Sequence, residues 1–167
     1  VLFLESFFNQ MKGRSKEEIY NFFVSLVEKE KGGINFDLVA TLTGHLKNGD
    51  RVVILSGSLQ PFLEVFIQQL DIKADAIGTL LFFDRDEICT GKVRKINHGV
   101  EKVNRLKVWI NENDANAEEI WAYADSESDI PLLEFADRAI VVGPSDALKM
   151  IAESKGWETF APLKGQS

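Results

Sequence analysis

The sequence predicts an α/β fold, a parallel β-sheet flanked by helices, with a helical region ahead of it. From about residue 36 onward, short apolar runs rich in β-branched residues alternate with segments of helical periodicity. Such alternation is typical of a parallel sheet covered by helices, in which ligands bind at the carboxyl ends of the strands. The chain has 167 residues, of which 45% are hydrophobic, and this is enough for one domain with a substantial core.

The first 35 residues are expected to be helical. Ser15-Lys16-Glu17-Glu18 has the pattern of a capping box, and Lys31-Gly32-Gly33 is expected to end the helix. Between them runs an apolar stripe at helical spacing: Ile19, Phe22, Phe23, Leu26 and Val27. The aromatic side chains of this region are expected to pack between helices, the alternative being a pocket for substrate or lipid: Phe3, Phe7, Phe8, Phe22 and Phe23.

The remaining elements follow in strict order along the chain. Helices are expected over residues 38–46, 61–70, 99–111, 130–135 and 146–155. Strands are expected over residues 51–55, 76–83, 90–94, 120–124, 139–142 and 157–160. The run 51–55 is almost continuously apolar, which is typical of a strand buried on both faces. The polar residues 84–87 predict a turn between two short strands.

The composition excludes several classes of partner. A net charge of −7 argues against nucleic acid or an anionic membrane, because binding to either needs a basic surface. No apolar run approaches the roughly 18 residues that a membrane span requires, and no leader pattern is present. Cys89 is the single cysteine, so no internal disulfide can form, and it is expected to be a small buried apolar residue. These observations together predict a cytoplasmic protein.

An acidic turn is the first candidate functional site. Asp125 follows the strand 120–124, and Asp129 comes four residues later at the start of a helix. Two carboxylates at such a turn suit Mg²⁺, which usually takes one or two protein carboxylates and leaves room for phosphate oxygens. The alternative is an acidic surface turn with Asp129 as a helix N-cap.

A small polar segment is the second candidate. Ser56-Gly57-Ser58 follows the strand 51–55 and is expected to open the next helix. A hydroxyl, a glycine and free N–H groups at a helix N-terminus can bind an anion, although an ordinary turn with a serine cap has the same pattern. Between the two candidates Lys102 lies in a helix, where a lysine is usually just solvated.

The order of these features resembles the haloacid dehalogenase-like phosphatase superfamily. The closest resemblance is to the branch of phosphoserine phosphatases and phosphatidylglycerophosphatase-C-like hydrolases. Three segments carry it: Leu55-Ser56-Gly57-Ser58-Leu59-Gln60-Pro61, His98-Gly99-Val100-Glu101-Lys102-Val103, and the run 123–133, YADSESDIPLL. Gly143-Pro144 and Gly156-Trp157 also fit the usual ending of that branch, so that the resemblance covers about residues 36–160.

The resemblance implies a role for each candidate residue. Ser56 and the Gly57 N–H would bind a phosphate oxygen, and Lys102 would neutralise the phosphate and the nucleophile. Asp125 would ligate Mg²⁺, while Asp129 would hold the water shell of the metal or orient Lys102. Lys102, Asp125 and Asp129 are thus the expected catalytic residues, and Asp125 and Asp129 the expected metal site. Such a site acts through positioning and electrostatics around a phosphoryl group.

The resemblance also implies a domain organisation and an activity. Residues 36–167 would form a Rossmann-like core, and residues 1–35 part of a helical cap. The activity would be that of a Mg²⁺-dependent phosphomonoester hydrolase that works through an aspartyl-phosphate. Two positions depart from the phosphoserine phosphatase form, because Ala124 stands where glycine is usual and Ser128 where asparagine is common. These departures bear on the substrate more than on the metal.

The nucleophile that the family uses, in an Asp-x-Asp-Gly-Thr motif after a first strand, has no match before Ser56. The upstream aspartates are Asp37 and Asp50, and neither belongs to an Asp-x-Asp pair. Asp84-Arg85-Asp86 has the spacing, but it lacks the Gly-Thr that should follow and is expected to be a hairpin turn. The core is therefore expected to lack its first strand. Either another chain, which could be a second copy in a homo-oligomer, or a complementing segment is expected to fill that place, or the protein is expected to be unstable alone.

Two further interpretations stay open. The chain could be a truncated or inactive domain that binds phosphate and Mg²⁺ or serves as an interaction module. An unrelated receiver or nucleotide-binding domain is disfavoured, because no glycine-rich dinucleotide or P-loop fingerprint occurs. The expected substrate is a small phosphorylated molecule, and phosphoserine, another small ester and a phospholipid headgroup all remain candidates.

Overall fold

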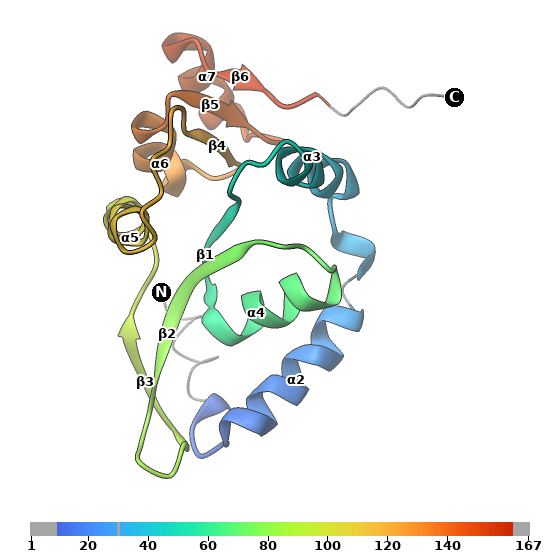
Figure 1. Ribbon diagram of the computed structural model, residues 1–167, viewed down its shortest axis with the longest axis vertical. Helices are drawn as coiled ribbons and strands as arrows, with labels where there is room; N and C mark the ends of the chain where they lie inside the picture. Colours follow the sequence, from blue (N-terminus) through green and yellow to red (C-terminus); the bar gives the residue numbers. More distant parts are fainter. Residues whose placement is uncertain (1–9, 30, 162–167) are drawn as a thin grey trace. The chain divides into compact units, whose positions relative to one another are not determined.

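The computed structural model describes residues 10–29 and 31–161. The chain divides into two compact units, Val1–Asn97 and His98–Ser167, and each combines helices with a three-stranded sheet (Figure 1). The predicted α/β fold, with parallel strands flanked by helices, is therefore confirmed. The expected boundary between a cap and a core at residue 35 stays a prediction.

The first unit is built around the sheet β1-β2-β3. Its β1 and β2 are parallel, whereas β2 and β3 form an antiparallel hairpin. Helix α4 contacts both β2 and α2, and Figure 1 shows it lying between them. The elements are α2 (Lys16–Lys29), η1 (Lys31–Gly33), α3 (Phe36–Lys47), β1 (Val53–Leu59), α4 (Gln60–Gln69), β2 (Asp75–Phe83) and β3 (Cys89–Lys95).

The start of α2 confirms the capping box. The Glu18 N–H donates to Ser15 Oγ at 3.1 Å, and the Ser15 N–H donates to Glu18 Oε2 at 2.8 Å. The apolar stripe of α2 then packs into a core that also draws on α4 and on both hairpin strands. Cys89 is buried there, as expected. The core comprises Met11, Ile19, Phe23, Val27, Leu59, Val65, Leu81 and Cys89. Phe3, Phe7 and Phe8 lie outside the described residues.

The polar segment between β2 and β3 is the hairpin turn that the sequence predicts. Asp84 Oδ1 accepts hydrogen bonds from the N–H groups of Asp86 and Ile88, both at 3.0 Å. The Asp84 N–H donates to the Ile88 carbonyl at 2.9 Å, which closes the turn. Asp84 thus stabilises the local backbone, and the Asp-x-Asp spacing here reflects turn chemistry.

Strand β1 differs from its prediction in two respects. It continues through Ser56-Gly57-Ser58 to Leu59 instead of ending at residue 55. It is also only half-buried up to Ser58, whereas the apolar run predicts burial on both faces. The reason is its place in the sheet: among the described strands β1 pairs with β2 alone and so forms one edge.

The second unit holds the sheet β4-β5-β6, whose strands are all parallel. Helix α6 packs on β4 and β5 and also contacts α5, while α7 packs on β5. Gly156 ends α7 in the left-handed conformation, with φ of 69°. The elements are α5 (Val100–Glu112), β4 (Trp121–Ala124), η2 (Glu127–Asp129), α6 (Ile130–Phe135), β5 (Arg138–Val141), α7 (Asp146–Lys155) and β6 (Glu158–Thr159).

Within residues 10–29 and 31–161, no helix is both long enough and apolar enough to cross a membrane.

Candidate functional site

The residues that the sequence singles out fall in two segments, one in each unit. Ser56 and Gly57 lie in β1 of the first unit, and Lys102, Asp125 and Asp129 lie in the second.

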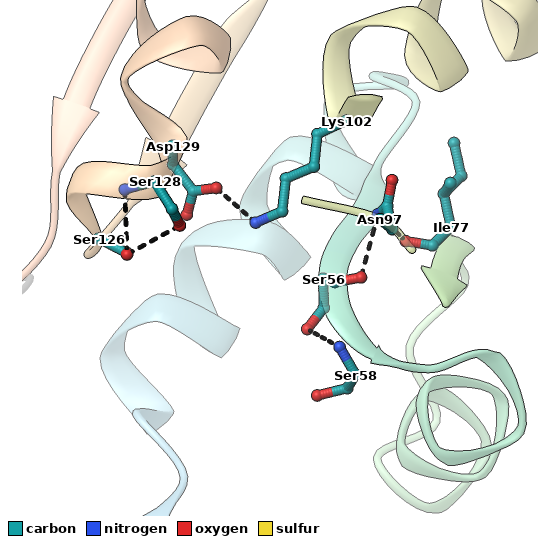
Figure 2. Close-up of polar contacts among 8 residues, drawn as sticks. All are labelled: Ser56, Ser58, Ile77, Asn97, Lys102, Ser126, Ser128 and Asp129. Atoms are coloured by element: carbon teal, nitrogen blue, oxygen red, sulfur yellow. Dashed lines mark hydrogen bonds and ion pairs between the residues drawn. The ribbon is translucent and has the colours of Figure 1, made fainter. Parts of the chain in front are cut away.

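In the first segment, β1 bulges away from regular pairing with β2. Leu55 pairs with Ile77 and Leu59 with Thr79, so four positions along β1 span only two along β2. The bulge comprises Ser56, Gly57 and Ser58, which lie opposite the single residue Gly78 of β2. The Ser58 N–H turns back to Ser56 Oγ at 3.1 Å (Figure 2). A β-bulge of this kind re-aims the backbone and is common beside active sites.

The bulge replaces the expected helix N-terminus. Helix α4 begins at Gln60 with Leu59 at the N-cap position, so Ser56-Gly57-Ser58 does not open the helix, and that prediction is wrong. Pro61 occupies the first turn of the helix, where its missing N–H costs nothing, and this places the helix start after the serines. Any anion bound by this segment would therefore meet strand peptide groups instead of the end of a helix.

The bulge presses closely on β2 at Gly78. A Cβ atom at this position would lie 2.8 Å from the Ser58 carbonyl oxygen and 2.9 Å from the Gln60 Cα and N atoms, all of which are backbone. The Gln60 side chain continues the pairing beyond the bulge: its Oε1 accepts from the Gly78 N–H at 2.6 Å and its Nε2 donates to the Ala76 carbonyl at 3.0 Å. Gly78 is thus required because no side chain fits.

Two buried polar residues hold the other side of the bulge, and the sequence patterns did not identify either of them. Asn97 and Thr79 are both 0% exposed. Asn97 Nδ2 donates to the Ser56 carbonyl at 3.0 Å (Figure 2), and Thr79 Oγ1 donates to the Gly57 carbonyl at 2.7 Å. The one available signal was the position of Asn97, directly before the His98-Gly99 motif.

In the second segment, Lys102 and Asp129 form a buried ion pair. Lys102 lies in the first turn of α5, and its Nζ donates to Asp129 Oδ1 (Figure 2). The side chains are 8% and 9% exposed. A buried charge is stable only when it is paired and hydrogen-bonded, so the two groups depend on one another. Lys102 is therefore buried and paired, unlike a typical solvated lysine on a helix.

The turn after β4 presents the two aspartates differently. Asp129 is the N-cap residue of α6, but in the described part of the chain its carboxylate makes no capping hydrogen bond and is directed to Lys102 instead. Asp125 is exposed at the carboxyl end of β4. Ser126 caps η2, since its Oγ accepts from the Ser128 N–H at 3.3 Å, and the two hydroxyls share a hydrogen bond of 2.9 Å (Figure 2).

The oxygen ligands at this turn suit a hard cation only in part. Within the described ranges, no group of three or more histidine, cysteine or acidic side chains is arranged to hold a metal ion. Asp125 is an accessible carboxylate, while Asp129 is engaged by Lys102. Mg²⁺ commonly binds through one or two carboxylates and completes its shell with water and substrate phosphate, so a single accessible carboxylate fits it better than it fits a fully protein-ligated cation.

Two groups near these elements have altered proton affinities. Burial raises the pKa of the Tyr123 phenol in β4, Arg138 opposes this rise and Glu158 adds to it, so the phenol is neutral at pH 7. Burial lowers the pKa of Arg105 in α5, and the charge of Glu101 acts in the opposite direction. The guanidinium nevertheless stays protonated at neutral pH.

Comparison with known protein families decides the assignment. The profile described as haloacid dehalogenase-like hydrolase matches residues 1–134. The chain belongs to this family. The resemblance of its motifs to the phosphoserine phosphatase branch is supported by a phosphoserine phosphatase of Lactococcus lactis, which is 32% identical over 117 residues, covering 67% of this chain and 50% of that protein.

A second curated relative is also a phosphatase by name, and a solved structure shares the fold. A histidinol-phosphatase of Neisseria meningitidis is 29% identical over 68% of this chain and 52% of its own length. A crystal structure of a Bordetella pertussis protein of unknown function shares the fold, with a TM-score of 0.85 and 23% identity over 94% of this chain and 72% of that one. The chain spans about half the length, or less, of the curated relatives that it matches.

Proposed function

We propose that this chain is the phosphatase domain of a Mg²⁺-dependent phosphomonoester hydrolase of the phosphoserine phosphatase-like branch. The observation that carries the proposal is the buried pair of Lys102 and Asp129 beside the exposed Asp125. Burying this ion pair costs desolvation free energy that apolar residues of similar size would not, so we infer that the charge of the lysine has a use. Family membership and the names of the relatives support phosphoryl transfer as that use.

Each residue has a distinct part in the proposed mechanism. Lys102 binds and neutralises the phosphate, and Asp129 orients the Lys102 amine through their ion pair. Ser56 and the Gly57 N–H bind a phosphate oxygen. Asp125, with Asp129 as the other proposed metal-site residue, would hold Mg²⁺, which when bound stabilises charge on the phosphoryl group. These residues position and neutralise, as phosphoryl transfer requires.

The family route through an aspartyl-phosphate also needs a carboxylate nucleophile. We propose that this nucleophile comes from a complementing segment that is not part of these 167 residues. The hairpin turn at Asp84 argues against a nucleophile there, since its carboxylate is occupied by backbone N–H groups. The second candidate function, an inactive domain that binds phosphate and Mg²⁺, is favoured by the absence of an Asp-x-Asp-Gly-Thr motif from the sequence.

The proposed substrate is a small phosphate monoester. Relatives named for phosphoserine and for histidinol phosphate support small soluble esters, and a phospholipid headgroup is the further candidate. A cytoplasmic location is proposed from the lone, buried Cys89, because a chain without disulfides suits a reducing compartment.

The test is hydrolysis of p-nitrophenyl phosphate with Mg²⁺, by this chain and by a longer protein that contains it. Asp125→Asn is the informative variant, because the residue is exposed and the fold should survive. We expect its turnover to fall by at least about a hundredfold, a loss typical of removing one electrostatic group from a site. Lys102→Ala should abolish turnover in the same assay.

Asp146→Asn is the matched control, an exposed aspartate in the first turn of α7. Turnover by the longer protein but not by the 167-residue chain would support a nucleophile supplied from outside this chain. Unchanged activity in Asp125→Asn and Lys102→Ala would show that the site is assigned wrongly, and no turnover in either protein would favour the inactive binding domain.

A further inference from the structure

The bulge of β1 is held by a buried network that the proposed chemistry does not use. Asn97 Nδ2 donates to two carbonyls, of Ser56 at 3.0 Å and of Ile77 at 2.7 Å. Thr79 Oγ1 donates to the Gly57 carbonyl at 2.7 Å and accepts from the Asn97 N–H at 3.1 Å. The two side chains therefore bind consecutive carbonyls of the bulge and are connected to each other.

The orientation of the Asn97 amide follows from its partners. Both groups that it faces are carbonyl oxygens, which only accept, so the nitrogen must point toward them. Its Oδ1 is buried and receives no donor from the described residues. An unsatisfied buried acceptor is costly, and such groups tend to persist where they serve a purpose. If this position between the strands had only a structural role, an apolar residue would fill it at a lower cost in free energy.

The network dictates where the N–H groups of the bulge point. In a trans peptide the C=O and the following N–H point in opposite directions. Fixing the Ser56 carbonyl therefore turns the Gly57 N–H away from Asn97, and fixing the Gly57 carbonyl turns the Ser58 N–H away from Thr79. The Ser58 N–H indeed meets Ser56 Oγ. The hydroxyl and two successive N–H groups are thus directed away from the network.

This arrangement is unusual for a strand and suits an anion. Successive carbonyls of a regular strand point to opposite sides, whereas those of Ser56 and Gly57 both bind the connected pair of Thr79 and Asn97. The Ser58 N–H donates to Ser56 Oγ, so the groups that this geometry offers to an anion are the Ser56 hydroxyl and the Gly57 N–H. The same bonds therefore explain why the bulge forms and what it can bind.

We propose that Thr79 and Asn97 are positioning residues of the phosphate site, which act by fixing the peptide groups of Ser56 and Gly57. The inference rests on the proposed function, because it assigns to this bulge the binding of a substrate phosphate. Neither side chain contacts the phosphate: both act through the backbone of the bulge. Thr79 is the better position to test, because its hydroxyl can be removed without a change of shape.

The experiment compares Thr79→Val, which keeps the volume and loses the hydroxyl, with Thr79→Ser, which keeps the hydroxyl. Inorganic phosphate is titrated into the 167-residue chain with Mg²⁺ present, and the amide resonances of Gly57 and Ser58 are followed by NMR. We expect Thr79→Val to bind phosphate about tenfold more weakly, the loss of roughly one hydrogen bond, and Thr79→Ser to stay within about twofold of the wild type.

A control separates positioning from general destabilisation. Val65→Ala removes buried volume from α4 in the core of the same unit and should leave phosphate affinity unchanged as long as the chain is folded. Asn97→Ala, which leaves space for a water molecule, is the second variant if Thr79→Val does not fold, and we expect it to weaken binding by a similar factor.

The outcomes distinguish the two proposals. If the wild type, Thr79→Val and Thr79→Ser all bind phosphate with equal affinity, the positioning role is overturned and the proposed function stays intact. A wild-type chain that shows no phosphate-dependent shifts would overturn the proposed function, and this inference with it. Weaker phosphate binding in Thr79→Val, with unchanged binding in Thr79→Ser and Val65→Ala, would support both proposals.

Discussion

The bulge of β1 and the turn after β4 are both held by side-chain interactions, but the interactions differ in kind. Each contains a serine whose Oγ accepts the N–H two residues on, Ser56 in the first and Ser126 in the second. The bulge is then held by neutral hydrogen bonds from Thr79 and Asn97 to its backbone. The turn instead directs a charged side chain, Asp129, to the buried Lys102.

This difference shows what each region can offer a ligand. Neutral bonds to carbonyls orient peptide N–H groups, which supply direction without net charge. The ion pair orients an ammonium group, which supplies a positive charge. Burial strengthens the electrostatic attraction between that charge and an anion. The two regions are therefore expected to respond to substitution in separable ways.

The largest effect on stability is expected when one partner of the buried pair of Lys102 and Asp129 is removed. Lys102→Met and Asp129→Asn should each lower the free energy of unfolding by about 3 to 5 kcal/mol, because each leaves the partner buried without compensation. Chemical denaturation measures the loss. The double variant Lys102→Met with Asp129→Leu should recover most of the stability while remaining unable to bind phosphate.

Lys155→Met provides the matched control for that prediction. Lys155 pairs with Glu134 at 2.6 Å, but the side chains are 41% and 49% exposed, so its loss should cost less than about 1 kcal/mol. Equal losses in Lys155→Met and Lys102→Met would mean that burial of the Lys102 pair is not what makes it important.

A smaller effect is expected where the bulge meets β2. Gly78→Ala places a methyl group within 3.0 Å of three backbone atoms, as the 2.8 and 2.9 Å distances require. The backbone must shift, and the expected cost is about 1 to 3 kcal/mol in thermal or chemical unfolding. Phosphate affinity should fall as well, since the shift moves Ser58.

Gly44→Ala is the corresponding control in the same unit. Gly44 lies inside α3, where an added Cβ meets nothing within 4 Å. Alanine there should raise stability by about 0.5 to 1 kcal/mol, because it lowers the entropy of the unfolded chain. If Gly78→Ala were as well tolerated as Gly44→Ala, the close contact between bulge and strand would not exist in solution.

The smallest effect on stability, and the sharpest contrast, is expected for the two serines. Ser56→Ala and Ser126→Ala each remove one local hydrogen bond, at a cost of about 1 kcal/mol. Isothermal titration with inorganic phosphate and Mg²⁺ should nevertheless separate them. Affinity should fall in Ser56→Ala and change little in Ser126→Ala, whereas equal affinities would remove Ser56 from the phosphate site.

Most helices and strands could be predicted from the sequence, for physical reasons. Helical periodicity, the Ser15 capping box and the Asp84 turn are local signals, and local signals are read directly from neighbouring residues. Lys102 and Asp129 stand out only through a motif, because a helical lysine by itself is usually exposed. Their burial against each other is a tertiary fact.

The bulge and its supports could not be predicted. A run such as Leu55-Ser56-Gly57-Ser58 is compatible with a strand end, a helix cap or a bulge, and the register against β2 decides among them. Thr79 and Asn97 lie 22 and 41 residues from their partners Gly57 and Ser56, so no local pattern links them. Neutral hydrogen bonds to backbone leave no charge pattern in the sequence.

The proposed function requires that the bulge and the turn bind the same phosphate group. The direct test is one NMR titration of the 167-residue chain with inorganic phosphate at saturating Mg²⁺, in which the amides of Gly57 and Ser128 are followed together. The account predicts that both resonances shift with the same midpoint concentration, and that Asp125→Asn moves both midpoints upward. Shifts at only one of the two amides, or midpoints that differ by more than about tenfold, would contradict it.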